Sequence, residues 1–259
     1  MTIQKLSLEQ WFTNYQLAAV RRRHFHLPME VAADISLVLK EWRKKNSGEP
    51  PYTALLAKAV GILASEMPHV NRAVFSTFYG PRLIQFERVV VNMPIIVPAD
   101  GRDHLSAILI QDPQKLSLDE IRGVIAAGRK RDINKMPFGR FLVRSGNYFW
   151  NRAILRLVHF LVFQFPAIYV RFGGGGVSVS SLLNHRGKTF NGTPHAAFHT
   201  AFTFCSFSAY EAGDGRTIMN VGINWDHYAA SGNELGAAIR RFSDILSGED
   251  PTVLMELIR

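Results

Sequence analysis

The side chains best suited to chemistry lie together in one short stretch, residues 222–232. Asp226 comes directly before His227, and the stretch ends in Ser231 and Gly232. An unperturbed imidazole has a pKa of about 6.5, so near neutral pH it is largely a free base that can accept a proton from an attacking nucleophile. We therefore single out His227 as a candidate general base. The simpler alternative is a strand-end histidine that a backbone carbonyl satisfies.

The flanking residues predict the elements that would hold this histidine. Residues 217–225 are typical of a strand, and residues 201–210 alternate along a second strand. The turn at residues 213–215, Gly-Asp-Gly, joins them and predicts a β-hairpin. Residues 233–246 have the apolar spacing of a helix. A strand, a tight turn and a helix can hold one imidazole rigidly at the edge of a sheet.

The rest of the chain favours an α/β fold in a single domain, residues 1–259. Its clearest local signals are an Ala/Leu-rich helix at 52–66 and a capping box formed by Ser117 and Glu120. The helix that this capping box opens is expected to continue to about residue 131. Further helices are expected at 5–20 and 35–45, and further extended segments at 26–34, 73–79, 83–98, 107–110 and 177–183. This order predicts a two-layer sandwich in which helices cover one face of a mixed β-sheet.

Residues 132–172 are basic, aromatic and helix-prone, and they predict a helical insertion. The simplest interpretation is an extra packed helical pair. The functional alternatives are a lid or groove for a long acyl chain, or an interfacial helix that meets lipid or a carrier protein. Arg156, His159 and Pro166 interrupt its apolar run. Membrane contact is therefore open, but a spanning helix is not expected.

Bulk composition narrows the function classes. The chain has 259 residues, 47% of them hydrophobic, which excludes a disordered protein. Its net charge of +9 favours an anionic partner such as a membrane surface, a phosphorylated cofactor or an acidic carrier protein. The basic residues are scattered and form no recognised nucleic-acid module, so no nucleic acid is expected. One cysteine, Cys205, excludes an internal disulfide, and the first residues lack an apolar signal core, so the expected location is cytoplasmic.

Other motifs are weaker. His195 and His199 have the spacing of helical metal ligands, but a strand pattern follows and no carboxylate is near, so no metal is expected. The glycines at 173–176 lack the Lys-Ser/Thr of a phosphate-binding loop and precede a strand, which favours a turn or a hinge. Cys205 alternates within an apolar strand and is expected in the core rather than as a nucleophile.

Four stretches, in order along the chain, resemble one superfamily. They are Val20-Arg-Arg-Arg-His-Phe25, Ala57-Lys-Ala-Val60 with Pro68-His-Val-Asn71, Ser178-Val-Ser-Ser-Leu182, and Asp226-His227 followed by Ser231-Gly232. These stretches resemble the chloramphenicol acetyltransferase-like superfamily, which includes the catalytic domains of the 2-oxo acid dehydrogenase acyltransferases. The chain looks like a free-standing, divergent member, because no lipoyl or subunit-binding segment precedes the matching region.

The resemblance implies an acyltransferase. Such an enzyme moves an acyl group from a thioester, carried by coenzyme A or by the phosphopantetheine of an acidic acyl carrier protein, to a hydroxyl, thiol or amine acceptor. His227 matches the general base, and Ser180 matches the hydroxyl that stabilises the oxyanion. The alternative for Ser180 is an ordinary strand serine beside Ser178 and Ser181. The family further implies a homotrimer with active sites between subunits.

Two departures from the family pattern affect the histidine loop. Position 228 is Tyr where the dihydrolipoamide branch has Arg, and position 231 is Ser where the family has Asp or Asn. In the acetyltransferases that acid pairs with an arginine matching Arg21, and a serine cannot form the ion pair. Arg21 and Ser231 are therefore candidate substrate-binding residues, and the alternative for Arg21 is a solvated basic edge formed with Arg22 and Arg23. Asp226 is expected to support the site by capping the turn. The alternative function is a non-catalytic scaffold or carrier-protein-binding module on the same fold.

Overall fold

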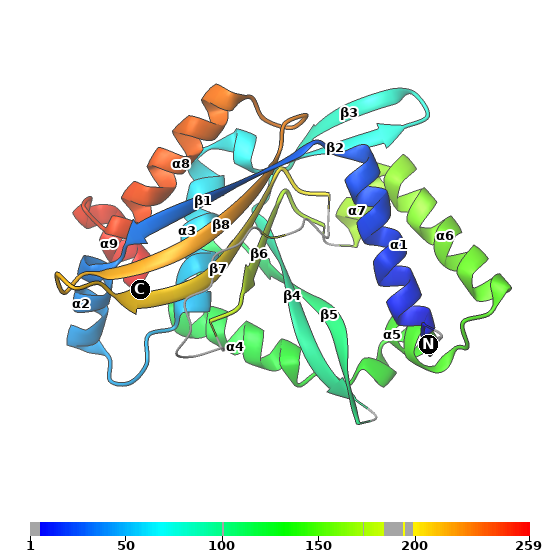
Figure 1. Cartoon of the computed structure of the whole chain (residues 1–259), viewed down its shortest axis with the longest axis horizontal. Coiled ribbons are helices and arrows are strands. Elements are labelled where there is room, and N and C mark those ends of the chain that lie inside the picture. The colour runs from blue at the N-terminus through cyan, green and yellow to red at the C-terminus, as the bar shows by residue number, and fades with distance from the viewer. Residues whose placement is uncertain (1–5, 100, 173, 184–193, 195–198) are drawn as a thin grey trace.

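The computed structural model describes residues 6–99, 101–172, 174–183, 194 and 199–259. Its centre is a six-stranded sheet of order β1-β8-β7-β6-β4-β5 (Figure 1). The strands are β1 (His26–Asp34), β4 (Val90–Ala99), β5 (Arg102–Gln111), β6 (Val177–Ser181), β7 (Phe202–Glu211) and β8 (Thr217–Asp226). β6 runs parallel to both of its neighbours, whereas the other pairs are antiparallel. The sheet is therefore mixed, as the sequence predicted.

The hairpin that leads to the candidate histidine is confirmed. β7 and β8 pair antiparallel from Phe202 opposite Trp225 to Glu211 opposite Thr217. Gly215 has a φ of +81° in the turn between them, a value that a glycine adopts without strain. β1 lies on the other side of β8, and His26 stands opposite Asp226. β8 is thus fixed on both edges up to the residue before His227.

Five helices pack on one face of this sheet and enclose the main core. They are α2 (Ser36–Lys45), α3 (Tyr52–Glu66), α4 (Leu118–Arg129), α8 (Gly232–Ser247) and α9 (Pro251–Ile258). Alternate side chains of β8, such as Val221, Ile223 and Trp225, point into this core, because successive residues of a strand face opposite sides. The predicted two-layer α/β sandwich is confirmed.

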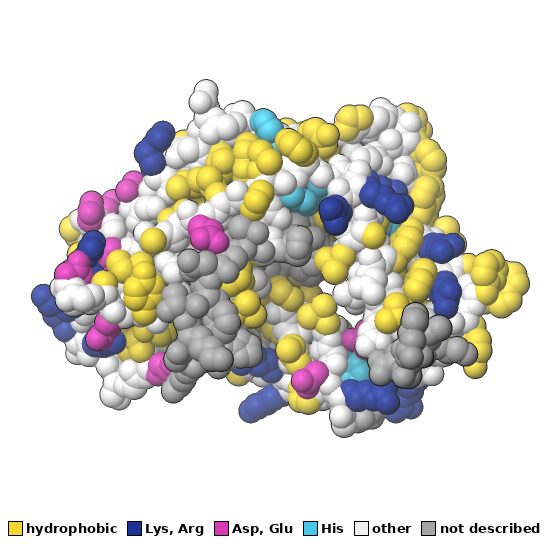
Figure 2. All heavy atoms as spheres, in the orientation of Figure 1, with side chains coloured by type: hydrophobic (Ala, Val, Ile, Leu, Met, Phe, Trp, Pro, Cys, Tyr) yellow, Lys and Arg dark blue, Asp and Glu magenta, His cyan; other side chains and the backbone are white. Residues whose placement is uncertain are grey.

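A second group of helices, here called the helical arm, lies beside the sheet (Figure 1). It consists of α1 (Leu8–Arg23), α5 (Pro137–Arg144), α6 (Phe149–Gln164) and α7 (Pro166–Arg171), and α6 also contacts the separate hairpin of β2 (Arg72–Thr77) and β3 (Gly80–Gln85). Glu9 ties the arm to β5, since its carboxylate accepts bonds from His104 Nδ1 at 2.7 Å and the Leu105 N–H at 3.1 Å. Figure 2 shows hydrophobic side chains along the outer edge of the arm.

Some predicted boundaries were wrong. The single strand expected at 83–98 is two strands, β3 and β4, which belong to different sheets. The break between them is held by Asn71, whose Nδ2 donates to the carbonyls of Phe86 and Arg88 at 3.1 and 3.0 Å. Helix α1 continues to Arg23 instead of ending near residue 20, and α9 was not predicted. The helical nature of 132–172 is confirmed, whereas its status as an insertion in a single domain stays a prediction.

Candidate functional site

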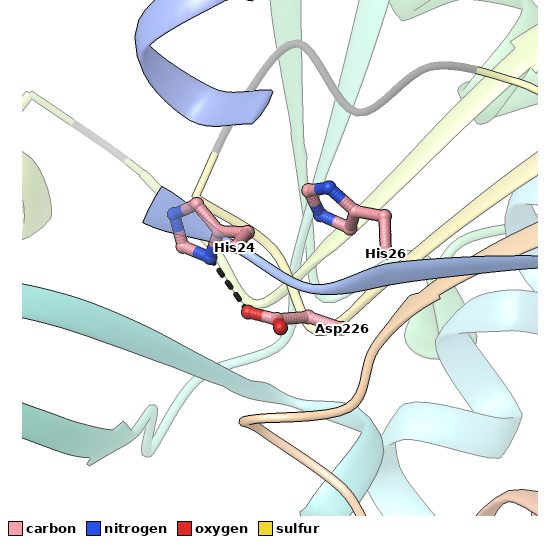
Figure 3. Close-up of side chains that lie close together, drawn as sticks. All are labelled: His24, His26 and Asp226. Atoms are coloured by element: carbon pink, nitrogen blue, oxygen red, sulfur yellow. Dashed lines mark hydrogen bonds and ion pairs between the residues drawn. The ribbon is translucent and has the colours of Figure 1, made fainter. Parts of the chain in front are cut away.

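The last residue of β8, Asp226, is the centre of a buried hydrogen-bond network (Figure 3). One carboxylate oxygen accepts a bond from His24 Nδ1 at 2.6 Å. The other accepts from the backbone N–H groups of Phe25 at 3.2 Å and Tyr228 at 3.1 Å. The Asp226 side chain therefore joins the end of α1, the start of β1 and the turn that carries His227.

The electrostatics of Asp226 follow from these contacts. Its burial alone would raise the pKa of the carboxyl. The hydrogen bond and the charge of His24, with the N–H of Tyr228, act in the opposite direction and outweigh burial, so the pKa lies below its usual value. Asp226 is therefore ionised near neutral pH and accepts several donors at once, which makes it a firm anchor for the turn.

The network extends through His24 to His199. His24 Nε2 lies 3.2 Å from His199 Nδ1, and the His199 ring is enclosed by the rings of Phe75, Phe163 and Tyr169. Burial, with the nearby His24, His159 and Arg23, holds the pKa of His199 well below its ordinary value. His199 is therefore neutral. A carboxylate can only accept, so His24 donates to Asp226 through Nδ1, and a second hydrogen bond joins His24 Nε2 to His199 Nδ1.

His227 lies one residue beyond this network and is exposed. Its backbone N–H donates to the Phe25 carbonyl at 2.9 Å, and its ring centroid lies 4.9 Å from that of Trp225 and 6.0 Å from that of Phe25. Its Nδ1 is 3.4 Å from the Ala230 carbonyl oxygen. A carbonyl accepts but does not donate, so this contact favours the tautomer with hydrogen on Nδ1 and leaves the Nε2 lone pair able to accept a proton.

Ser231 and Arg21 do not meet. Ser231 is the N-cap of α8, where its N–H donates to Glu234 Oε2 at 2.7 Å and its hydroxyl accepts from the Glu234 N–H at 3.4 Å. Glu234 also forms an ion pair with Arg72 at 3.1 Å. Arg21 lies exposed in the last turn of α1, and in the described part of the chain no hydrogen bond or ion pair joins it to Ser231. Substrate binding by these two residues stays a prediction.

Ser180 and His227 are far apart on one chain. Ser180 pairs with Cys205, and Cys205 pairs with Gly222, so Ser180 is level with a point five residues before His227. With a rise of about 3.3 Å per residue and strands about 4.8 Å apart, the backbone positions of the two residues are roughly 16 Å apart along the sheet and 10 Å apart across it. One copy of the chain does not bring them together.

Three residues could hold a metal ion: His24, His26 and Asp226, whose ligand atoms lie within 4.8 Å of one another (Figure 3). Imidazole and carboxylate suit zinc, whose tetrahedral ligands at about 2.0–2.1 Å from the ion stand about 3.3 Å apart. The 2.6 Å between His24 Nδ1 and Asp226 Oδ2 is instead the length of a charge-assisted hydrogen bond. The absence of a metal stays a prediction, and His195 lies outside the described residues.

A surface cavity of about 1140 Å³ opens near the other end of the sheet. Its lining includes Arg122 and Arg129 of α4, Lys130 directly after it, and the acids Glu49 and Asp119. Neither His227 nor Ser180 is part of its lining, so the cavity is not where these candidate side chains lie. Its cations could meet an anionic group of a bound molecule.

Sequence reasoning missed the role of His24. The residue stands in the stretch that resembles the family's Arg-Arg-x-His-Phe, where the sequence predicts a role for Arg21 alone. Asp226 does cap the turn after β8, since its side chain accepts the Tyr228 N–H. Its bond to His24 joins residues 202 positions apart, and no local pattern signals such a pair.

Comparison with known proteins gives a likeness of structure only. No family model matches this chain, and none of the curated proteins searched matches it. The catalytic core of the 2-oxoacid dehydrogenase multienzyme complex from Thermoplasma acidophilum is 16% identical, with a TM-score of 0.67 over 97% of this chain and 99% of that chain. The cubic core of a pyruvate dehydrogenase complex is 17% identical, with a TM-score of 0.65 over 98% of this chain and 94% of that chain.

A third structure bears on the site. The dihydrolipoamide acetyltransferase of Azotobacter vinelandii is 16% identical, with a TM-score of 0.63 over 98% of this chain and 94% of that chain. Its structure was determined to investigate a serine, a histidine and an asparagine in the catalytic mechanism of that enzyme. The resemblance noted in the sequence is therefore confirmed at the level of structure: the chain has the fold of the 2-oxo acid dehydrogenase acyltransferase catalytic cores, at a sequence identity that marks it as divergent.

Proposed function

We propose that the chain is a thioester-dependent acyltransferase in which His227 is the general base. The observation that carries the proposal is the exposed position of the His227 ring and the orientation of its two nitrogens. Its ring is exposed, its Nδ1 faces the Ala230 carbonyl, and its Nε2 can accept a proton. The turn that carries it is anchored by the ionised, buried Asp226. The fold adds support, because acyltransferase cores share it.

The proposed reaction needs no covalent enzyme intermediate. His227 Nε2 removes the proton from the acceptor hydroxyl, thiol or amine as the acceptor attacks the thioester carbonyl. The resulting tetrahedral oxyanion accepts a hydrogen bond from the Ser180 hydroxyl. When the intermediate collapses, the carbon–sulfur bond breaks and the imidazolium of His227 returns its proton to the leaving thiolate. An acyl thioester and an acceptor thereby give the acylated acceptor and a free thiol.

The separation of Ser180 from His227 places one condition on this mechanism. If both act on one substrate, Ser180 must come from another copy of the chain. This agrees with the homotrimer that the family resemblance implies, with active sites between subunits. The matching structures include cores of multienzyme complexes, which supports an assembly of this kind.

The thioester donor in this proposal is coenzyme A or the phosphopantetheine of an acyl carrier protein. The net charge of +9 suits either anionic carrier. Arg129 and Lys130, at the end of α4, line the surface cavity and would suit a phosphate group, whereas Arg122 is paired with Asp119. A cytoplasmic location, where both carriers occur, is part of the proposal. In the described residues no helix is long and apolar enough to cross a membrane.

The first test measures transfer directly. Purified protein is incubated with a panel of acyl-coenzyme A and acyl-carrier thioesters and with candidate acceptors, and products are identified by mass spectrometry. We expect His227→Ala to lower kcat/KM by about 10²–10⁴-fold and Ser180→Ala by about 10²–10³-fold. Lys40→Ala changes an exposed residue of α2, away from the site, and should leave the rate unchanged. Equal rates for wild type and His227→Ala would refute the proposal.

Mixed assemblies test the shared site. When His227→Ala and Ser180→Ala subunits are unfolded and refolded together, some sites combine an intact His227 with an intact Ser180 of another copy. Activity should then exceed that of either variant alone. No recovery, in a preparation shown to contain mixed oligomers, would mean that Ser180 does not act across the interface. Binding of thioesters without any turnover by the wild type would instead favour a carrier-binding scaffold.

A further inference from the structure

Helix α6 is apolar on two opposite sides. One side carries Leu155, His159 and Phe163, which are buried. They are spaced four residues apart and face α1, where Leu155 joins a cluster with Leu8 and Phe12, and Phe163 packs with Val20. These contacts account for the inner stripe of the helix. They do not account for its outer stripe.

The outer stripe is made of large side chains in solvent. Trp150, Ile154 and Leu157 are 75%, 50% and 56% exposed, and with a half-buried Leu161 they recur at helical spacing, on the side opposite Leu155. A monomeric surface rarely leaves a continuous apolar stripe of this kind without a partner. In Figure 2 hydrophobic side chains line this edge of the helical arm, with Lys and Arg side chains beside them.

Neighbouring segments extend the same apolar surface. The tip of the β2–β3 hairpin reaches α6, since the Phe78 and Phe160 rings lie 5.4 Å apart. Phe78 and its neighbour Tyr79 are 70% and 86% exposed. In α6, α7 and the residues next to them, the further exposed large side chains are Tyr148, Phe149, Val158, Phe160, Phe165, Val170 and Phe172. Trp, Tyr and Phe are the side chains favoured at the boundary between lipid and water.

The charges beside this surface have one sign. Residues 133–210 contain no Asp or Glu. The exposed cations of the helical arm are Arg21, Arg22, Arg140, Arg144, Arg156 and Arg171, and its one acid, Glu9, is bonded to His104 and Leu105 of β5. An apolar stripe with cations around it and no carboxylate complements an anionic lipid surface, whose headgroups attract each nearby Lys or Arg. A second copy of the same face would instead bring cations against cations.

From these observations we propose that the outer face of α6, with the tip of the β2–β3 hairpin, docks on the surface of an anionic lipid bilayer. Helix α6 has 16 residues, a length of about 24 Å. Spanning a bilayer takes about 20 apolar residues, so α6 would lie along the interface and bury its outer stripe between headgroups and acyl chains. This inference does not depend on the proposed catalysis, because it concerns binding alone.

The test uses the full chain and phosphatidylcholine vesicles with or without phosphatidylglycerol. Flotation measures binding. Fluorescence reports burial of Trp150, because this indole is 75% exposed while Trp42 and Trp225 are buried and Trp11 is half-buried. We expect binding that requires phosphatidylglycerol, with a blue shift of emission. The triple variant Trp150→Ser, Ile154→Ser, Leu157→Ser should bind at least about a hundredfold more weakly.

Two further variants sharpen the test. Arg140→Gln with Arg144→Gln leaves the apolar stripe intact and should weaken binding to anionic vesicles roughly twentyfold. Leu37→Ser with Met255→Ser is the matched control, since these side chains are 39% and 51% exposed on α2 and α9, away from the arm, and binding should not change. Absence of binding to anionic vesicles by the wild type would overturn the proposal. So would a triple variant that keeps its vesicle binding but loses its oligomeric state, because the stripe would then be an interface between copies.

Discussion

Helices α3 and α6 have similar length and are both rich in apolar residues, yet they differ in burial. Eleven of the 15 residues of α3 are buried, against three of the 16 residues of α6. Helix α3 lies between the sheet and the helices α4, α8 and α9, so every side of it meets a neighbour. Helix α6 meets α1, α7 and β2 on its inner side, and its outer stripe is exposed.

The difference separates two uses of apolar residues. In α3 they stabilise the fold, because folding removes them from water. In α6 only the inner stripe does so, and the exposed stripe contributes almost nothing to the stability of the isolated chain. We infer that the exposed stripe serves to bind a partner. The same substitution should therefore change the free energy of unfolding more in α3 than in the outer stripe of α6.

The largest expected effect is a contrast between two leucines. Leu63 in α3 is fully buried, and Leu157 in α6 is 56% exposed. Leu63→Ala should lower the free energy of unfolding by about 2–5 kcal/mol, because it leaves a cavity among packed neighbours. Leu157→Ala should change it by about 0.5 kcal/mol or less. Urea unfolding of the two variants checks this, and comparable losses would show that the outer stripe of α6 is covered by protein.

Local sequence patterns predicted the limits of α3, but they did not predict which side of α6 is exposed. The Ala/Leu-rich run and the following Pro68 predicted α3 with the limits that it has, and the capping box of Ser117 and Glu120 predicted the start of α4. The helices of the arm were expected as well. However, apolar residues on both sides of a helix predict burial on both sides. Which side stays exposed depends on where the tertiary structure places α1 and the sheet.

At the candidate site, too, local sequence patterns predicted the elements but not the contacts between distant residues. The hairpin and the turn placed His227 at a strand end, as expected from residues close to it in the sequence. The anchor of its turn was not predictable, because His24 and Asp226 are 202 positions apart and depend on the pairing of β1 with β8. Ser231 was weighed for its loss of an ion pair with Arg21, and its observed use, a helix cap with Glu234, follows a local pattern that was available.

A second prediction concerns the exception within α3, the fully buried Lys58. Its Nζ has no hydrogen-bond partner among the described residues, and burial, with the charge of Arg259, lowers the pKa of this amine to about 8. The unfolded chain keeps the proton up to about pH 10.5, so between pH 8 and 10.5 it binds more protons than the folded chain. Stability should therefore rise with pH across that window.

Lys58→Met should remove this dependence. At neutral pH the variant should be more stable than wild type by up to roughly 3 kcal/mol, because no cation then has to be buried. Denaturant unfolding at pH 7 and at pH 10 measures both effects. Lys45→Met, at an exposed position of α2, is the control and should follow the wild-type curve. A less stable Lys58→Met would mean that the amine has a favourable partner in solution.

The third prediction tests the contact between the helical arm and the sheet, where His24, directly after α1, donates a hydrogen bond to Asp226 of β8. His24→Ala should lower the free energy of unfolding by about 1.5–3 kcal/mol near neutral pH, because a buried carboxylate loses a charge-assisted donor. The His24 bond helps to hold the Asp226 pKa below its usual value. A lowered pKa stabilises the fold above the unfolded pKa of about 3.9, and this stabilisation is lost as pH falls through the folded value.

The difference between wild type and His24→Ala should therefore shrink below about pH 4. Thermal unfolding across the acidic range measures it, and Arg22→Ala, at an exposed position of α1, is the control. His24→Ala should also raise the hydrogen-exchange rate of the Tyr228 amide, whose N–H donates to Asp226, while the amides of α3 stay protected. Unchanged exchange at Tyr228 would show that the backbone bonds of β8, not His24, hold the turn that presents His227.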